Sequence, residues 1–392
     1  MTETAVVDPS ARPGARVDAV DWNTARRVAR YAAGRDPLSD SYLLRTLETD
    51  FAAVTTEAEE LVSEFTGLVA PGRAQAGVVD RGGWIDANVA SMQRLLAPIT
   101  AKVGARVSQT PLAPIGKHFA GTELGVLLGY MSQRVLGQYD LLVPEPAAAD
   151  GPPDDGELGN PELGDQVFYV GPNVLALEKR FAFRPLDFRR WIAIHELTHR
   201  AQFTGVPWLR GYFLSLVERT LSLVEPDPRI LLRAAARAAE SLSRGRSPFD
   251  DAGLIGLFAS DEQRAVLDEM QALMSLLEGH GNYVMNALGA RHVHGVERME
   301  RVLQQRREAK GISGQFQKAL GIQMKMRQYE VGEAFLDAVV EQAGIGAIDA
   351  AWAGPENLPT LPELRDASRW LGRVHGATVA SSGPRRSRSR SS

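Results

Sequence analysis

The sequence of 392 residues contains no cysteine, which excludes disulfide bonds and any metal site built on thiolates. Positive charge is not in excess: the net charge is -4 at pH 7, which is not typical of a nucleic-acid-binding protein. No run approaches the roughly twenty apolar residues of a membrane-spanning helix. The polar stretch 1–16 has no apolar core of a secretory signal. These absences predict a cytoplasmic protein whose partners are neither membranes nor nucleic acids, and they leave its oligomeric state open.

Hydrophobic residues make up 44% of the chain, enough for a large core, and most of them recur at helical spacing. The clearest predicted helix spans residues 22–33, with Asp21 as its N-cap and Gly34 at its end. The best strand candidate spans residues 166–173, and the N-terminal third is predicted to be helical throughout. We therefore expect a mainly α protein with a small β element. Further helices are predicted over residues 42–65, 122–136, 212–224, 229–244, 261–288, 313–343 and 361–374.

Composition divides the chain into segments. Both ends are polar, and one internal stretch is rich in Pro, Gly, Asp and Glu with almost no large apolar side chain. We predict that the two long folded regions pack together as one unit. The predicted segments are a disordered N-terminus over 1–20, a helical region over 21–142, an exposed acidic loop over 143–165, a catalytic region over 166–376 and a disordered basic tail over 377–392.

Residues 191–203, with the sequence WIAIHELTHRAQF, contain the pattern H-E-x-x-H within an apolar, helix-compatible run. Residues four apart lie one turn above the other on a helix, so His195 and His199 can direct two imidazoles at one metal ion. Glu196 is rotated away by about a third of a turn, which suits a general base acting on a metal-activated water. A solvated helix face is the alternative, and Arg200 favours it. The apolar flanks favour the metal, because unpartnered histidines in a buried helix are costly.

A catalytic zinc needs a third protein ligand and one open position for water. Glu218 and Glu278 both follow the motif. Glu278 lies beside Gly279 and Gly281, and glycines within a predicted helix are tolerated where another element approaches the backbone closely. A ligand helix that crosses the metal helix would need such an approach, so we favour Glu278. Glu218 has no such packing signature.

Five more residues are candidates for supporting roles around the metal or the substrate. His280 lies two positions after Glu278, on a different side of a helix, and fits a supporting contact, a substrate contact or a buried core histidine. Asn282, one turn beyond Glu278, could orient the carboxylate. Tyr283 belongs to the same segment. Arg327 and Tyr329 could stabilise the charge on a tetrahedral intermediate, although ordinary packing also explains them.

These segments resemble the zincin-like metallopeptidases of an actinobacterial hydrolase group, and most closely the branch associated with deazaflavin coenzyme biosynthesis. The likeness lies in residues 195–203, 278–280 and 283–285. It continues through residues 21–22, 81–88, 137–140, 205–209, 325–329 and 355–360, and so spans nearly the whole chain. The resemblance implies a mostly helical zincin fold and Zn2+ as cofactor. The Glu-Gly element also resembles that of the thermolysin-like clan, which implies Glu278 as the ligand that completes the site. Asn286 departs from the acidic residue expected there.

We therefore predict a zinc-dependent hydrolase that acts on a peptide or protein substrate, with Glu196 as the base. The strand at 166–173 is a candidate edge for binding an extended peptide, or else an ordinary half-buried strand. One alternative function is a zinc-binding accessory protein of deazaflavin coenzyme metabolism that cleaves no peptide. Another is a helical scaffold without metal.

Overall fold

The computed structural model describes residues 20–36, 38, 41–107, 113–141, 166–222, 261–308 and 322–381. The predicted acidic loop at 143–165, the predicted helix at 229–244 and most of both predicted disordered ends lie outside the described residues. By their contacts the described residues form two units, residues 1–36 with 79–135 and residues 37–78 with 136–392. The predicted packing of 21–142 with 166–376 as one unit stays a prediction.

The described residues of the first unit lie mostly in three helices. Its members are α1 (Trp22–Ala33), α3 (Arg81–Val107) and α4 (Ala113–Ser132). The side chain of Asp21 accepts a hydrogen bond from the Thr24 amide and Gly34 ends the helix, so the predicted bounds of α1 are confirmed. Helices α1 and α4 pack closely at glycines of α4, since a Cβ on Gly125 would lie 2.6 Å from the carbonyl oxygen of Ala25.

The second unit contains a three-stranded sheet in the order β1-β3-β2. The strands are β1 (Gln75–Val79), β2 (Gly137–Tyr139) and β3 (Gln166–Val170), and β2 pairs antiparallel with β3. Strand β3 is the middle strand, so the prediction that residues 166–173 form a substrate-binding edge is wrong. Residues 171–173 of the predicted strand segment begin helix α5 instead. The presence of β1 also corrects the prediction that the N-terminal third is entirely helical.

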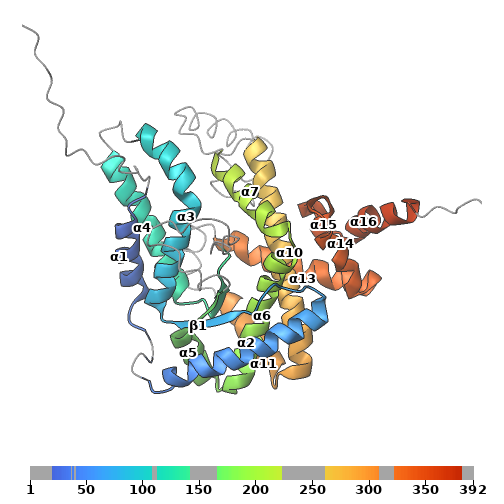
Figure 1. Ribbon diagram of the computed structural model, residues 1–392, viewed down its shortest axis with the longest axis horizontal. Coiled ribbons are helices and arrows are strands. Elements are labelled where there is room, and N and C mark those ends of the chain that lie inside the picture. Colours follow the sequence, from blue (N-terminus) through green and yellow to red (C-terminus); the bar gives the residue numbers. More distant parts are fainter. Residues whose placement is uncertain are drawn as a thin grey trace, which may run out of the picture. The chain divides into compact units, whose positions relative to one another are not determined.

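Helices make up most of the other described residues of the second unit, and the predicted mainly α fold with a small β element is confirmed. Helix α10 packs against α6, α7 and α13, and α6 also packs against α2 (Figure 1). The sequence did not predict α5, α11 or α14. The helices are α2 (Leu44–Thr66), α5 (Gly171–Phe181), α6 (Pro185–Gly205), α7 (Leu209–Ser222), α10 (Asp261–His292), α11 (Val296–Glu308), α13 (Ile322–Ala343), α14 (Asp349–Trp352), α15 (Leu361–Leu364) and α16 (Ala367–Ser381).

Helix α6 is buried along nearly its whole length, and two arginines fix it to its neighbours. Arg189 donates two hydrogen bonds to Glu178 of α5, at 2.8 and 2.9 Å, and pairs with Asp50 of α2. Arg200 is 1% exposed and bonds to Glu59 of α2 at 2.5 Å. The interpretation of Arg200 as a sign of a solvated helix face is therefore wrong, because its charge is neutralised inside the protein.

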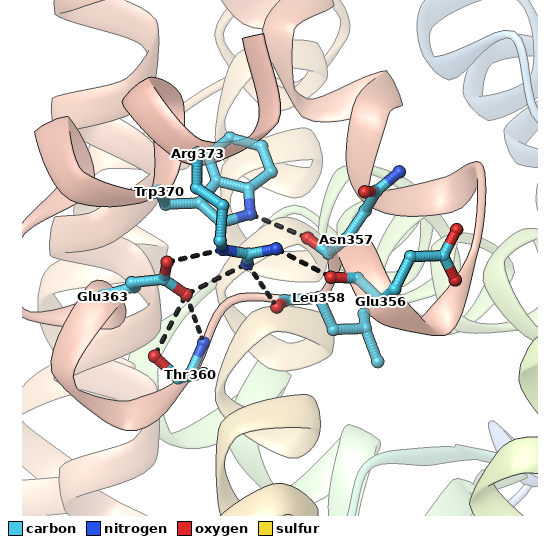
Figure 2. Close-up of polar contacts among 7 residues, drawn as sticks. All are labelled: Glu356, Asn357, Leu358, Thr360, Glu363, Trp370 and Arg373. Atoms are coloured by element: carbon cyan, nitrogen blue, oxygen red, sulfur yellow. Dashed lines mark hydrogen bonds and ion pairs between the residues drawn. The ribbon is translucent and has the colours of Figure 1, made fainter. Parts of the chain in front are cut away.

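Arg373 of α16 holds the segment between α14 and α15 in place (Figure 2). Its guanidinium donates to both carboxylate oxygens of Glu363, at 2.7 and 3.0 Å, and to the backbone oxygens of Glu356 and Leu358. Glu363 also caps α15 through Thr360. Burial alone would raise the pKa of Glu363, but the hydrogen bonds from Arg373 and Thr360 outweigh it and hold that pKa below its ordinary value. The cluster fixes the chain that follows Trp352.

A substitution of Glu363 should make the stability of the fold less dependent on pH. A carboxyl group whose pKa is lowered on folding stabilises the fold above its unfolded pKa, and this stabilisation is lost as the pH falls below about 4.5. We expect Glu363→Gln to lower the free energy of unfolding by about 1–2 kcal/mol at pH 7. The deficit should shrink below pH 4.5, as measured by urea unfolding at a series of pH values. A deficit of constant size would contradict the assigned role of the charge.

Candidate metal centre

Two histidines of α6 and one glutamate of α10 come together in the second unit. The Nε2 atoms of His195 and His199 lie 3.1 Å apart, and Oε2 of Glu278 lies 3.8 and 3.7 Å from them. The imidazole rings are nearly perpendicular, at 86°. Zinc ligands about 2.1 Å from a tetrahedral ion lie about 3.4 Å from one another, so the spacing of these three atoms suits such an ion. No other group of this kind occurs among the described residues.

Helix spacing and a glycine explain how α6 and α10 bring these three side chains together. His195 and His199 lie one turn apart on the same face of α6. Gly281 of α10 faces both rings, because a Cβ there would lie 3.2 Å from His195 and 3.1 Å from His199. Gly279 instead faces α13, where a Cβ would lie 2.4 Å from the carbonyl carbon of Gly332. The predicted close approach to the metal helix therefore applies to Gly281, while Gly279 serves the crossing of α10 with α13.

Glu218, the competing candidate for the third ligand, lies on α7 with an exposed side chain and takes no part in this group. The structure thus brings Glu278 to the histidines and leaves Glu218 outside. The sequence signal that separated the two was the pair Gly279 and Gly281, of which Gly281 faces the histidines.

Glu196 lies on a different side of α6 from the histidines and contacts strand β2. A Cβ on Gly137 would lie 2.6 Å from its Cγ and 2.8 Å from its Oε1, so a glycine at this point of β2 leaves room for the carboxylate. Glu196 is 8% exposed. The pKa of buried Tyr169 on β3 is raised by burial and, to a smaller extent, by the charge of Glu196. The carboxylate of Glu196 is therefore held between α6 and the sheet.

The electrostatic field at the three side chains favours positive charge. Burial alone would lower the pKa of His199, but Glu278, then Glu196 and the hydrogen bond to Gln202, outweigh burial and raise that pKa to about 9. Two carboxylates near a buried imidazole thus stabilise a cation at this point. A divalent metal ion would meet the same field.

Gln202, which the sequence analysis did not single out, joins His199 to His280. Its amide contacts Nδ1 of each ring at 2.9 Å and the carbonyl oxygen of Leu277 at 3.1 Å. His280 is 2% exposed and packs edge-on against the ring of Trp352. Burial, and then the nearby charge of His199, lower the pKa of His280 to about 3. The only sequence signal for Gln202 was its position three residues after His199.

Asn282 and Tyr283, two of the other predicted supporting residues, make no hydrogen bond with the three ligand candidates among the described residues. Asn282 is 2% exposed, and neither atom of its amide makes a hydrogen bond to a described residue, Glu278 included. Tyr283 packs against Phe65 of α2, with ring centroids 6.4 Å apart. Arg327 and Tyr329 lie on α13, in a stretch whose side chains are outside the described residues.

A family model of zincin-like metallopeptidases matches residues 20–371, and the chain belongs to this family. The predicted family resemblance is thereby confirmed, while the actinobacterial and deazaflavin branch stays a prediction. The chain is also similar to a crystal structure of a proposed hydrolase with a novel fold from Chloroflexus aurantiacus, with 30% identity and a TM-score of 0.63. The match covers 91% of this chain and 99% of that one. A search of the curated proteins finds no match. Among the described helices, none combines the length and hydrophobicity needed to span a lipid bilayer.

Proposed function

We propose that the protein is a zinc-dependent hydrolase that cleaves peptide bonds. The observation that carries this proposal is the convergence of His195, His199 and Glu278, whose ligand atoms all lie within 4.8 Å of one another. Two imidazoles and a carboxylate form the donor set of catalytic rather than structural zinc. Membership of the zincin-like metallopeptidase family supports the same reaction.

In this proposal His195, His199 and Glu278 bind the ion, and Glu196 transfers the proton. Zinc held there would activate a water molecule and polarise the carbonyl group of the substrate. Glu196 accepts the proton of the attacking water at a carboxylate oxygen and returns it to the leaving amine. Its position suits this role, because it belongs to the same helix as the two histidines and packs against Gly137 rather than joining the ligand group.

Metal content is the direct test of the ligand set. We expect about one zinc per chain in the purified protein, and loss of the metal in His195→Ala and Glu278→Ala. Glu218→Ala should keep the metal, because Glu218 is exposed on α7 away from the group. Elemental analysis of the four proteins measures this. Zinc that is retained in Glu278→Ala would overturn the proposed ligand set. A wild-type protein that binds no zinc would favour the alternative of a helical scaffold without metal.

Peptide hydrolysis is tested separately from metal binding. A panel of unfolded proteins and short peptides should be degraded by the zinc-loaded protein, and a chelator should stop the reaction. A zinc-loaded protein that cleaves none of them would instead favour the accessory role in deazaflavin metabolism. Cleavage that is insensitive to the chelator would exclude zinc from the reaction.

Gly137→Ala should impair catalysis without removing the metal. The added methyl group would lie 2.6 Å from Cγ of Glu196, and the three atoms nearest to it all belong to Glu196, so the carboxylate must move. Because displacement of a catalytic group by about 1 Å can cost about 100-fold in rate, we expect a loss of that order in kcat, with zinc content unchanged. Gly211→Ala on α7 is the matched control, since its Cβ would meet nothing within 4 Å. Full activity in Gly137→Ala would show that Glu196 does not act from its observed position.

A further inference from the structure

The side-chain amide of Gln202 connects the two helices that carry the proposed ligands. Gln202 lies on α6 and is 0% exposed. One end of its amide lies 2.9 Å from Nδ1 of His199, on its own helix. The other end lies 3.1 Å from the carbonyl oxygen of Leu277 and 2.9 Å from Nδ1 of His280, both on α10. All three polar neighbours are therefore within hydrogen-bond distance of one buried group.

The carbonyl oxygen of Leu277 decides which way the amide faces. A carbonyl oxygen can only accept a hydrogen bond, so the NH2 end of Gln202 must point to it and the oxygen end must point to His199. Since Oε1 accepts, Nδ1 of His199 must carry the proton. In the neutral ring, the form that can bind a metal ion, the lone pair of His199 is then on Nε2, the atom that lies 3.1 Å from His195 and 3.7 Å from Glu278. A metal ion needs a lone pair on that nitrogen.

The second proton of the same NH2 group is directed to His280. Nδ1 of His280 accepts it, so the ring carries its own proton on Nε2. Trp352 packs against this ring, with centroids 5.2 Å apart and planes at 68°. Both the oxygen and the nitrogen of the Gln202 amide thus have partners. The donor and acceptor roles in this series of hydrogen bonds all follow from one backbone carbonyl, that of Leu277 beside Glu278.

We propose that Gln202 is a positioning residue that holds His199 with its Nε2 lone pair facing the metal site and ties α6 to the segment of α10 that carries Glu278. This inference rests on the proposed function, because it takes a metal ion at His195, His199 and Glu278 as given. Hydrogen bonds to the far nitrogen of a metal-binding histidine fix the ring and tautomer, and their loss typically weakens metal binding 10–100-fold.

Gln202→Met tests the proposal, since methionine keeps the length and bulk of the side chain and removes the amide. We expect its zinc dissociation constant, measured by competition with a chromophoric chelator, to rise about 10–100-fold above that of the wild type. Thr198→Val is the matched control. Thr198 is also 0% exposed on α6, and its hydroxyl donates to Ile194 of the same helix. This control should bind zinc as the wild type does.

Nitrogen-15 NMR of the wild-type histidines provides a second test that needs no variant. The sequence holds seven histidines, and His280 should show the form protonated on Nε2. A His280 protonated on Nδ1 would reverse the hydrogen-bond chain and overturn the proposal. Equal zinc affinity of Gln202→Met and wild type would also overturn it, with the proposed function intact. A wild-type protein without zinc affinity would sink the proposed function itself.

Discussion

Glu196→Gln should abolish most of the hydrolytic activity and leave about one zinc per chain. Glutamine has nearly the size of glutamate, so it fits the space beside Gly137, but its amide cannot accept and return the proton of the attacking water. General acid–base catalysis contributes about 10²–10⁴-fold to a rate, and we expect a loss of kcat in this range. Elemental analysis and a peptidase assay on the same preparation measure both quantities.

Glu218→Gln is the matched control for this substitution, because it makes the same chemical change on an exposed part of α7. Its activity should equal that of the wild type. Loss of zinc in Glu196→Gln would contradict the division of roles, since Glu196 would then contribute to holding the metal. Retained activity would assign the proton transfer to another group.

Arg189→Met should destabilise the second unit by about 3–5 kcal/mol. Arg189 is 3% exposed and forms a bidentate pair with Glu178, which is 6% exposed, so its removal leaves a buried carboxylate without its cation. Burial raises the pKa of Glu178, and Arg189 opposes that rise. Loss of Arg189 should raise it further. The deficit, measured by urea unfolding, should therefore grow with rising pH as Glu178 is forced to ionise.

The double variant Arg189→Met/Glu178→Leu separates loss of the pair from loss of one partner. Replacing both members of a buried ion pair by apolar groups is often neutral or stabilising. We expect the double variant to recover most of the stability that Arg189→Met loses. If it is as unstable as the single variant, the cost lies in packing around Arg189 rather than in the unpaired charge.

Local sequence patterns predicted the parts of the fold that depend on near neighbours. The cap at Asp21 and the end at Gly34 set α1, and the i, i+4 spacing of His195 and His199 placed both rings on one face of α6. The glycines at 279 and 281 favoured Glu278, which the structure brings to the two histidines, because space beside a helix backbone is a local property. These predictions needed no knowledge of distant pairing.

Long-range partners could not be read from the chain. Strand β3 became the middle strand because it pairs with segments far away in sequence, and a lone strand pattern does not reveal its neighbours. Arg200 looked like a surface residue because its partner, Glu59, lies 141 positions earlier. Gln202 was missed for the same reason, since the carbonyl oxygen that orients it lies 75 positions further on.

The indole of Trp352 brings the segment that follows α13 into contact with a residue beside the proposed metal site. Trp352 covers His280, and its backbone oxygen accepts a hydrogen bond from Trp208 just before α7. A chain shortened after α13 would keep every proposed ligand, yet the ring of His280 would lose its cover. We therefore expect the smallest fragment that keeps the surroundings of His280 to extend beyond Glu278, the last proposed ligand, and to include Trp352.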